Sequence, residues 1–258
     1  MKNSLRAILL SFFFLFLLTG ISLADSFGTN ITIYDENGYT GIGQGGEDKE
    51  TEPGMINNQS WDLEGFFLDG TTLTMVGGFD FVNGVDGYSD YTSGDIFIDI
   101  DGDAEYGDIH GTTGNNIVTN TFGYDYALDL DFTAKTYNVI ELDGASTVTV
   151  WYAQNQGSNP WLYNSGGTGK GSGTIAYETG LSDGDTGFAG GSHYAAAVDL
   201  AFLGADINNF TAHFTMGCGN DNLMGKVSNP VPEPATMLLF GSGLIGLAGM
   251  SRRKLRKS

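Results

Sequence analysis

Glycine divides this sequence into runs too short for most helices. There are 40 glycines among 258 residues, and Thr, Tyr and Phe are frequent between them. β-Branched and aromatic residues favour strands, whereas Gly, Asn and Asp favour turns. The expected strands are 30–34, 61–68, 73–82, 95–100, 124–132, 136–142, 147–152, 173–177, 195–203 and 210–216. We therefore predict an all-β fold, a β-sandwich or jelly roll, although 195–203 also fits one or two helical turns.

The first 24 residues have the parts of a secretory signal peptide. Lys2 and Arg6 precede an apolar run over 7–18, and the segment ends at the small residue Ala24. We predict that signal peptidase cleaves after Ala24. An uncleaved membrane anchor is the alternative, but the apolar run is short and a polar, Gly-rich chain begins at Asp25.

A second apolar run, 235–250, lies near the C-terminus. Its 16 residues would span about 24 Å as a helix, slightly less than a bilayer core of about 30 Å. A basic tail follows, beginning with Arg252, Arg253 and Lys254. Because such clusters stay on the cytoplasmic side, we predict a single transmembrane helix with the preceding domain outside the inner membrane.

Pro232, Glu233 and Pro234 lie directly before that run. The two prolines hold an extended segment that cannot join the helix, so a processing enzyme could take it into its cleft. The last 28 residues resemble the PEP-CTERM sorting signal, in which Pro-Glu-Pro precedes a Gly-rich apolar helix and an Arg-rich end. The resemblance implies a Gram-negative bacterium, an exosortase as partner, and a surface or matrix protein of bacteria that make exopolysaccharide. A plain single-span anchor is the alternative.

The signal peptide (1–24) and the sorting signal (230–258) leave one expected domain, 25–229. All 31 acidic residues lie between 25 and 234, together with only four of the 11 basic residues. A surface this acidic excludes nucleic acid as a partner, because nothing neutralises its phosphates. It suits divalent cations or basic partners, or a repulsion that keeps the protein soluble.

Two of the expected strands carry apolar side chains on one face and acidic side chains on the other. They are 95–101 and 124–132, in which period-2 alternation places three aspartates of each on a common face. If the strands are neighbours, their carboxylates crowd one surface. Like charges opposite each other destabilise a sheet unless water, salt or a cation compensates.

The segment Asp99-Ile-Asp-Gly-Asp103 matches the opening of many calcium loops, but Ala104 replaces the usual glycine and His110 replaces the glutamate of an EF-hand. Calcium prefers hard oxygen ligands on a flexible backbone. The candidate calcium ligands are Asp95, Asp99, Asp101, Asp103 and Asp108. A solvated acidic turn is the alternative, and a transition metal is disfavoured because His110 has no second His or Cys nearby.

Two short stretches, starting at Gly94 and Gly123, resemble strands of extracellular β-sandwich modules that bind carbohydrate. Sugar binding would need exposed aromatic rings as stacking platforms. The candidates are Trp151, Tyr152, Trp161 and Tyr163, for which core packing is the alternative.

Recognisable catalytic motifs are absent from the sequence: it has no nucleophile elbow, zinc-binding helix motif or phosphate loop. We therefore expect a non-enzymatic, adhesive or polysaccharide-associated protein of the cell surface or extracellular matrix. A secreted hydrolase that uses paired carboxylates is the alternative, because acids are abundant; an inert coat component is a third. Cys218, the only cysteine, is predicted to be a buried thiol rather than an intermolecular bridge.

Overall fold

The computed structural model describes residues 27–34, 55–105 and 114–228. The predicted signal peptide, transmembrane helix and sorting signal, together with Asp108, lie outside these ranges. Within the described ranges, no helix has the length and apolar character needed to cross a membrane.

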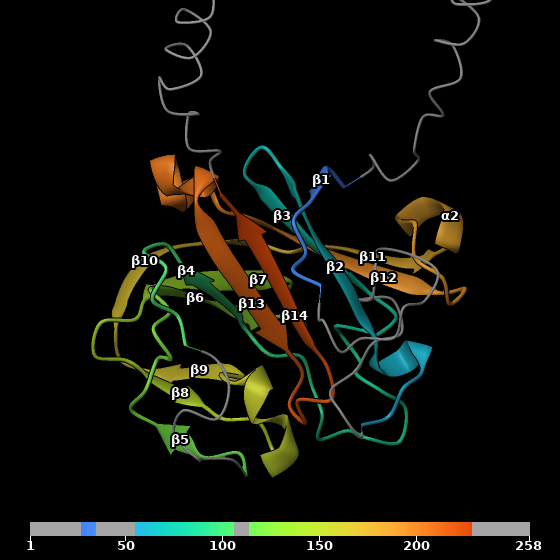
Figure 1. The fold of residues 1–258 in the computed structure, drawn as a ribbon, viewed down its shortest axis with the longest axis horizontal. Helices are drawn as coiled ribbons and strands as arrows, with labels where there is room; N and C mark the ends of the chain where they lie inside the picture. The colour runs from blue at the N-terminus through green and yellow to red at the C-terminus, as the bar shows by residue number, and fades with distance from the viewer. Residues whose placement is uncertain (1–26, 35–54, 106–113, 229–258) are drawn as a thin grey trace, which may run out of the picture.

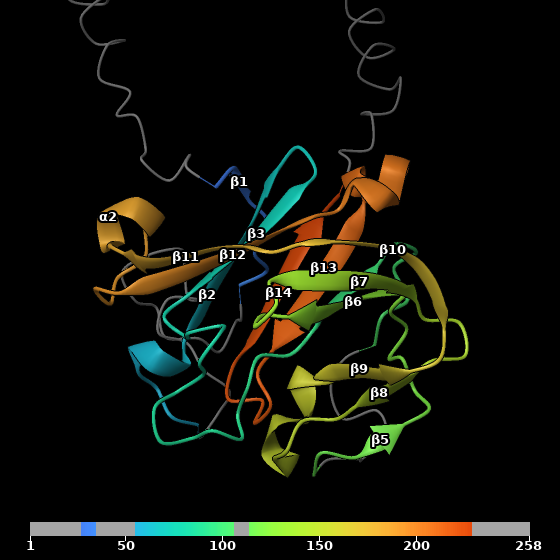
Figure 2. The ribbon, with the colours of Figure 1, turned by 180° about the vertical axis from the view of Figure 1, so that it is seen from behind.

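Two large antiparallel sheets form the body of the domain (Figures 1 and 2). The first contains β1 (Thr29–Asn30), β2 (Leu63–Asp69), β3 (Thr72–Gly77), β12 (His193–Asp199) and β11 (Ala176–Leu181), in that order. The second contains β10 (Thr168–Thr174), β7 (Thr136–Glu141), β6 (Tyr126–Asp131), β4 (Ile96–Asp99), β13 (Phe210–Thr215) and β14 (Asn222–Val227). The all-β prediction is confirmed, and the two sheets pack as a sandwich.

Among the described residues, a small third sheet and four short helices complete the fold. The third sheet contains β5 (Ile117–Val118), β8 (Ser146–Val148) and β9 (Leu162–Ser165). The helices are the 3-10 segments Gln59–Trp61, Ala153–Ser158 and Ala201–Asn208, and α2 (Asp183–Thr186). The expected strand 195–203 therefore ends early, because a 3-10 helix occupies its last residues.

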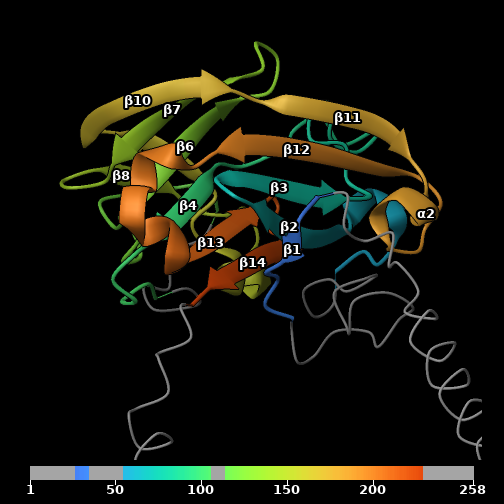
Figure 3. The same ribbon diagram turned by 90° about the horizontal axis from the view of Figure 1, so that it is seen from above.

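The two large sheets meet along both of their edges. At one edge, β10 and β11 follow each other with only Ile175 between them, so one long stretch of chain passes from the second sheet to the first (Figure 3). At the other edge, the chain after β1 pairs with β14: Thr32 bridges Gly225, and the Lys226 N–H donates to the Ile31 carbonyl at 2.7 Å. The sandwich is thus closed at one edge by a continuous chain and at the other by backbone pairing.

The main core lies between the large sheets. Ile96 and Ile98 of β4 and Leu128 of β6 are fully buried there, as their alternation predicts, beside Phe66 and Phe214. Burial of such side chains is the main favourable contribution to folding.

The opposite face of β4 and β6 is covered as well. Phe97 and Ala127 form a second cluster there with Phe122, Tyr124 and Leu142, beneath the third sheet. The acidic face predicted from the alternation is therefore only partly open to solvent, because the third sheet packs over its apolar members.

Candidate functional site

Strands β4 and β6 are neighbours, and their pairing brings acidic side chains together. Ile98 pairs with Tyr126, so Asp99 and Asp125 lie at the adjoining strand ends. Asp99, Asp101 and Asp125 each offer a carboxylate oxygen, and these oxygens lie within 4.8 Å of one another. We call these three residues the acidic cluster.

Asp99 organises the turn that carries the cluster. Its Oδ1 accepts the N–H groups of Asp101 at 3.1 Å and Gly102 at 2.7 Å, and its Oδ2 accepts that of Ala104 at 3.4 Å. Gly102 has a φ of 86°, which favours glycine. Short-range acceptance of this kind is typical of aspartate in turns, and it fixes the carboxylate without a counter-charge.

Asp125 is held in a similar way from the neighbouring strand. Its Oδ2 accepts the Ile100 N–H at 2.7 Å. In the part of the chain that the structure describes, no lysine or arginine forms an ion pair with the acidic cluster. Among the described residues, backbone N–H groups therefore hold Asp99 and Asp125 in place.

The pKa values of the acids in and beside the cluster reflect how close their carboxylates lie to one another. Burial raises the pKa of Asp125, and the charges of Asp101, Asp99 and Asp103 raise it further. The charge of Asp101 is the main cause that raises the pKa of Asp103. A bound cation would relieve this repulsion, and oxygens within 4.8 Å of one another are close enough to share a calcium ion, whose Ca–O distances are about 2.3–2.6 Å.

The acidic cluster borders an open polar hollow of about 560 Å³. The acidic residues that line the hollow are Asp101, Asp103, Asp125, Glu141 and Asp143. Thr119 and Thr121 add hydroxyl groups to the lining. Lys170 offsets one of the acids, because its Nζ lies 2.8 Å from Glu141 Oε2.

The structure separates the predicted calcium ligands. Asp99 and Asp101 belong to the cluster, and Asp103 lies beside them in the exposed hollow. Asp95 does not join them: its exposed fraction is 1 %, and its two oxygens accept backbone N–H groups of β6 and β9. Asp125 was missed as a ligand because it lies far along the sequence, although the alternation in 124–132 had placed it on the acidic face.

The predicted stacking residues also differ in exposure. Trp151 is 49 % exposed. Tyr163 is half-buried, and its hydroxyl donates to the Gly166 carbonyl at 2.7 Å. The prediction that Trp161 stacks against sugars is wrong. Its side chain is only 8 % exposed and packs against the backbone of Gly94 and Gly217, so its ring belongs to the core.

Cys218 is a free, buried thiol, as predicted. Burial raises its pKa to about 11, so the group is a neutral thiol rather than a nucleophilic thiolate.

The sequence analysis missed a second polar cluster, formed by Glu64 of β2, His193 of β12 and Asp183 of α2. Nδ1 of His193 lies 2.7 Å from Glu64 Oε2, and Nε2 lies 3.0 Å from Asp183 Oδ1. Glu64 and His193 are fully buried. No local pattern marks the pair, because 129 residues separate Glu64 from His193.

The C-terminal part of the chain matches a known protein-sorting motif. Residues 230–254 match the family model of the PEP-CTERM protein-sorting motif. The chain carries a PEP-CTERM sorting signal. The PEP-CTERM match confirms the resemblance, and it includes Pro232–Pro234 and Arg252–Lys254. A PEP-CTERM signal implies an exported protein that is membrane-anchored before an exosortase-type enzyme processes it. No curated protein and no solved structure matches the chain.

Proposed function

We propose that this exported protein is a non-enzymatic component of the cell surface or extracellular matrix of a Gram-negative bacterium. In this proposal, signal peptidase removes 1–24, exosortase processing follows, and the β-sandwich binds calcium and associates with extracellular polysaccharide. The observation that carries the proposal is the acidic cluster, three carboxylates held together beside an open polar hollow.

Calcium suits both the cluster and the hollow. It takes six to eight oxygen ligands. Three carboxylates supply fewer than six when some of them bind through only one oxygen. The remaining positions face the hollow, where carboxylates or hydroxyls of a polymer can complete the coordination. An anionic polysaccharide therefore fits this site only when the ion is present, because the hollow is otherwise negative.

Exposed aromatic surface supports the association. Trp151 presents half of its surface to solvent just after β8. A flat exposed ring can stack against the apolar face of a sugar, and its indole N–H can donate a hydrogen bond.

Calcium should stabilise the full-length chain against heat. A ligand at about 100 times its dissociation constant adds about 2.7 kcal/mol, which raises the melting midpoint by roughly 5–10 °C for a domain of this size. Melts of the detergent-purified chain in calcium and in chelator measure the shift. The double variant Asp101→Asn/Asp125→Asn should lose it.

The charge-matched control is Asp69→Asn/Asp86→Asn, which removes two exposed acids outside the cluster. It should keep the full calcium shift. Equal shifts with magnesium and sodium, or a shift that survives in the cluster variant, would contradict a calcium site at these residues.

Retention on immobilised polygalacturonate, an anionic polysaccharide, should require calcium and be reversed by chelator. Trp151→Ala should weaken retention about fivefold, the equivalent of about 1 kcal/mol of stacking. Ile117→Ala, which removes another exposed apolar side chain, is the matched control and should bind normally. Calcium-independent retention, or equal retention on neutral dextran, would argue against the proposal.

The alternative is a polysaccharide hydrolase. Asp125, with its raised pKa, could serve as the acid and Asp101 as its partner, since retaining glycosidases place two carboxyl groups about 5–5.5 Å apart. Incubation of the full-length chain with the native matrix separates the two functions: a hydrolase releases reducing ends, and a binding protein releases none.

A further inference from the structure

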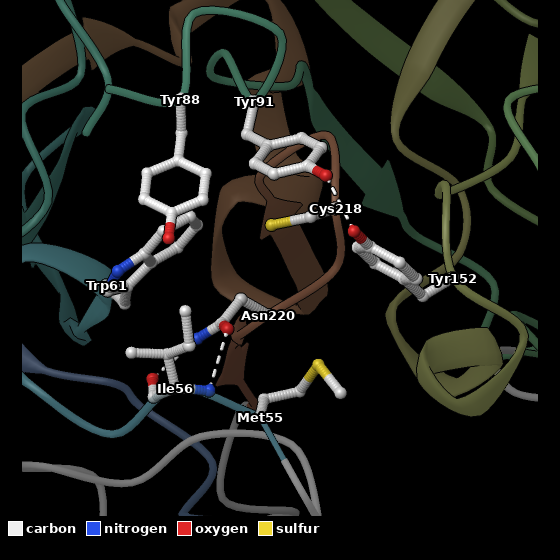
Figure 4. Close-up of a pocket in the computed structure, with 8 residues that line it drawn as sticks. All are labelled: Met55, Ile56, Trp61, Tyr88, Tyr91, Tyr152, Cys218 and Asn220. Carbon is white, nitrogen blue, oxygen red and sulfur yellow. Dashed lines mark hydrogen bonds between the residues drawn. The ribbon is translucent and has the colours of Figure 1, made fainter. Parts of the chain in front are cut away.

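A small aromatic pocket lies apart from the acidic hollow and shares none of its lining residues (Figure 4). Its volume is about 190 Å³. It is built from segments far apart in the sequence: the 3-10 helix at Trp61, the loop with Tyr88 and Tyr91, Tyr152 after β8, and Cys218 after β13.

Stacked aromatic rings form one side of this aromatic pocket. The rings of Tyr88 and Tyr91 lie nearly parallel, with centroids 5.9 Å apart and an interplanar angle of 21°. Trp61 meets Tyr88 edge-on at 5.1 Å and is itself buried, with an exposed fraction of 3 %. Tyr88 is 45 % exposed. The rings therefore fix each other, while the exposed Tyr88 leaves this side of the pocket accessible.

A pair of phenol hydroxyls supplies the polar part of the lining. Tyr91 Oη and Tyr152 Oη lie 2.6 Å apart, and Figure 4 shows them meeting beside the Cys218 thiol. Because one hydroxyl donates to the other, the pair keeps one proton to donate outward and lone pairs to accept. The hydrogen bond to Tyr152 is the main cause that raises the pKa of Tyr91 to about 12, so Tyr91 stays protonated at neutral pH.

Asn220, another polar side chain of the lining, is already engaged. Its Oδ1 accepts the Ile56 N–H at 3.0 Å, and its Nδ2 donates to the Ile56 carbonyl at 2.9 Å. Met55 and Ile56 complete the lining with apolar groups. No charged side chain lines the aromatic pocket among the described residues.

We propose that the aromatic pocket binds one small planar ring that carries a single hydroxyl group, a ligand of the phenol class. The volume fits, because an engineered apolar cavity of about 150 Å³ holds a benzene ring. The ring would lie against the aromatic side chains, and its hydroxyl would bond to the Tyr91–Tyr152 pair.

The same hydrogen-bond accounting disfavours a sugar in this pocket. A pyranose carries several hydroxyls, each of which loses water on entering. Among the described residues, the free side-chain groups of the lining are few: the Tyr91–Tyr152 pair, the Tyr88 hydroxyl and the Trp61 indole N–H. The aromatic pocket is thus a second site, independent of the proposed association with polysaccharide.

Phenol titrated into the full-length chain, followed by ligand-observed NMR, is the test. A ligand of this size should bind with a dissociation constant of about 1 mM. Benzene should bind about tenfold more weakly than phenol, and phenol should bind the double variant Tyr91→Phe/Tyr152→Phe about tenfold more weakly than the wild-type chain. Each change removes the hydrogen bond between the ligand and the pocket. Tyr126→Phe removes a hydroxyl from β6, outside the pocket, and should bind phenol normally.

A second measurement does not depend on any variant. Tyr88 and Tyr91 line the pocket, so saturating phenol should shift their ring NMR signals, and methyl glucoside should not. The proposal is overturned if phenol does not bind, if phenol and benzene bind equally to the wild-type chain, or if methyl glucoside competes with phenol.

Discussion

Replacing Asp95 with alanine should lower the free energy of unfolding by about 2–5 kcal/mol. The carboxyl group lies just before β4 and connects two other strands: Oδ1 accepts the Leu130 N–H of β6 at 2.8 Å, and Oδ2 accepts the Tyr163 N–H of β9 at 2.7 Å. Alanine leaves two part-buried donors without an acceptor, at about 1–3 kcal/mol each. Urea unfolding of the full-length chain at pH 6 measures the loss.

Asp95→Asn tests the charge rather than the hydrogen bonds. Burial raises the pKa of Asp95 to about 8, well above its ordinary value of 3.8. Because the folded pKa exceeds the unfolded one, the folded protein holds the proton more tightly, and stability falls as the pH rises from about 4 to 8. The wild-type chain should lose a few kcal/mol over this window, and Asp95→Asn should lose clearly less.

Asp69→Asn serves as the control for that experiment, since it removes an exposed carboxylate at the turn after β2. Its stability should follow the wild-type pH profile. If Asp95→Asn also follows the wild-type profile between pH 4 and 8, then Asp95 does not titrate in this range and the role assigned to its burial is wrong.

Replacing Glu64 with glutamine should cost about 3–5 kcal/mol, because it breaks a buried ion pair from one side. Glu64 and His193 both have side chains that are 0 % exposed, and the Gln59 amide donates to Glu64 Oε1 at 2.7 Å. Asp183, which contacts the other nitrogen of His193, is 54 % exposed. Asp183→Asn is therefore the matched control and should cost clearly less than Glu64→Gln.

The pH dependence of this pair has a defined sign. Burial lowers the pKa of His193, but the hydrogen bonds and charges of Glu64 and Asp183 outweigh it and leave the pKa raised above 6.5. The stabilisation is fully present below pH 6.5 and is lost as the pH rises through the folded pKa. NMR titration of His193 should give a lower pKa in Glu64→Gln. An unchanged pKa, or an equal loss of stability in Asp183→Asn, would contradict a buried ion pair.

Local patterns predicted the strands but not what covers them. The isoleucines of β4 and the leucines of β6 recur with period 2, which is enough to predict a strand and its apolar face. Phe97 and Ala127 interrupt the opposite face, and only the packed fold shows that the third sheet covers them. That packing depends on Val118 of β5 and Tyr163 of β9, which lie in two segments that the predicted strands did not include.

The PEP-CTERM signal could be read from sequence alone, because it is a linear motif defined by residues adjacent in the chain. The burial of Asp95 and the position of Asp125 at the hollow could not be predicted in this way. Both follow the same alternation, yet Asp95 is buried beneath β9 and bonded on both oxygens, while Asp125 faces the hollow. The aromatic pocket likewise joins Trp61, Tyr91 and Cys218 across the length of the domain. Tertiary structure alone decided these features, because burial depends on chain segments that are distant in sequence.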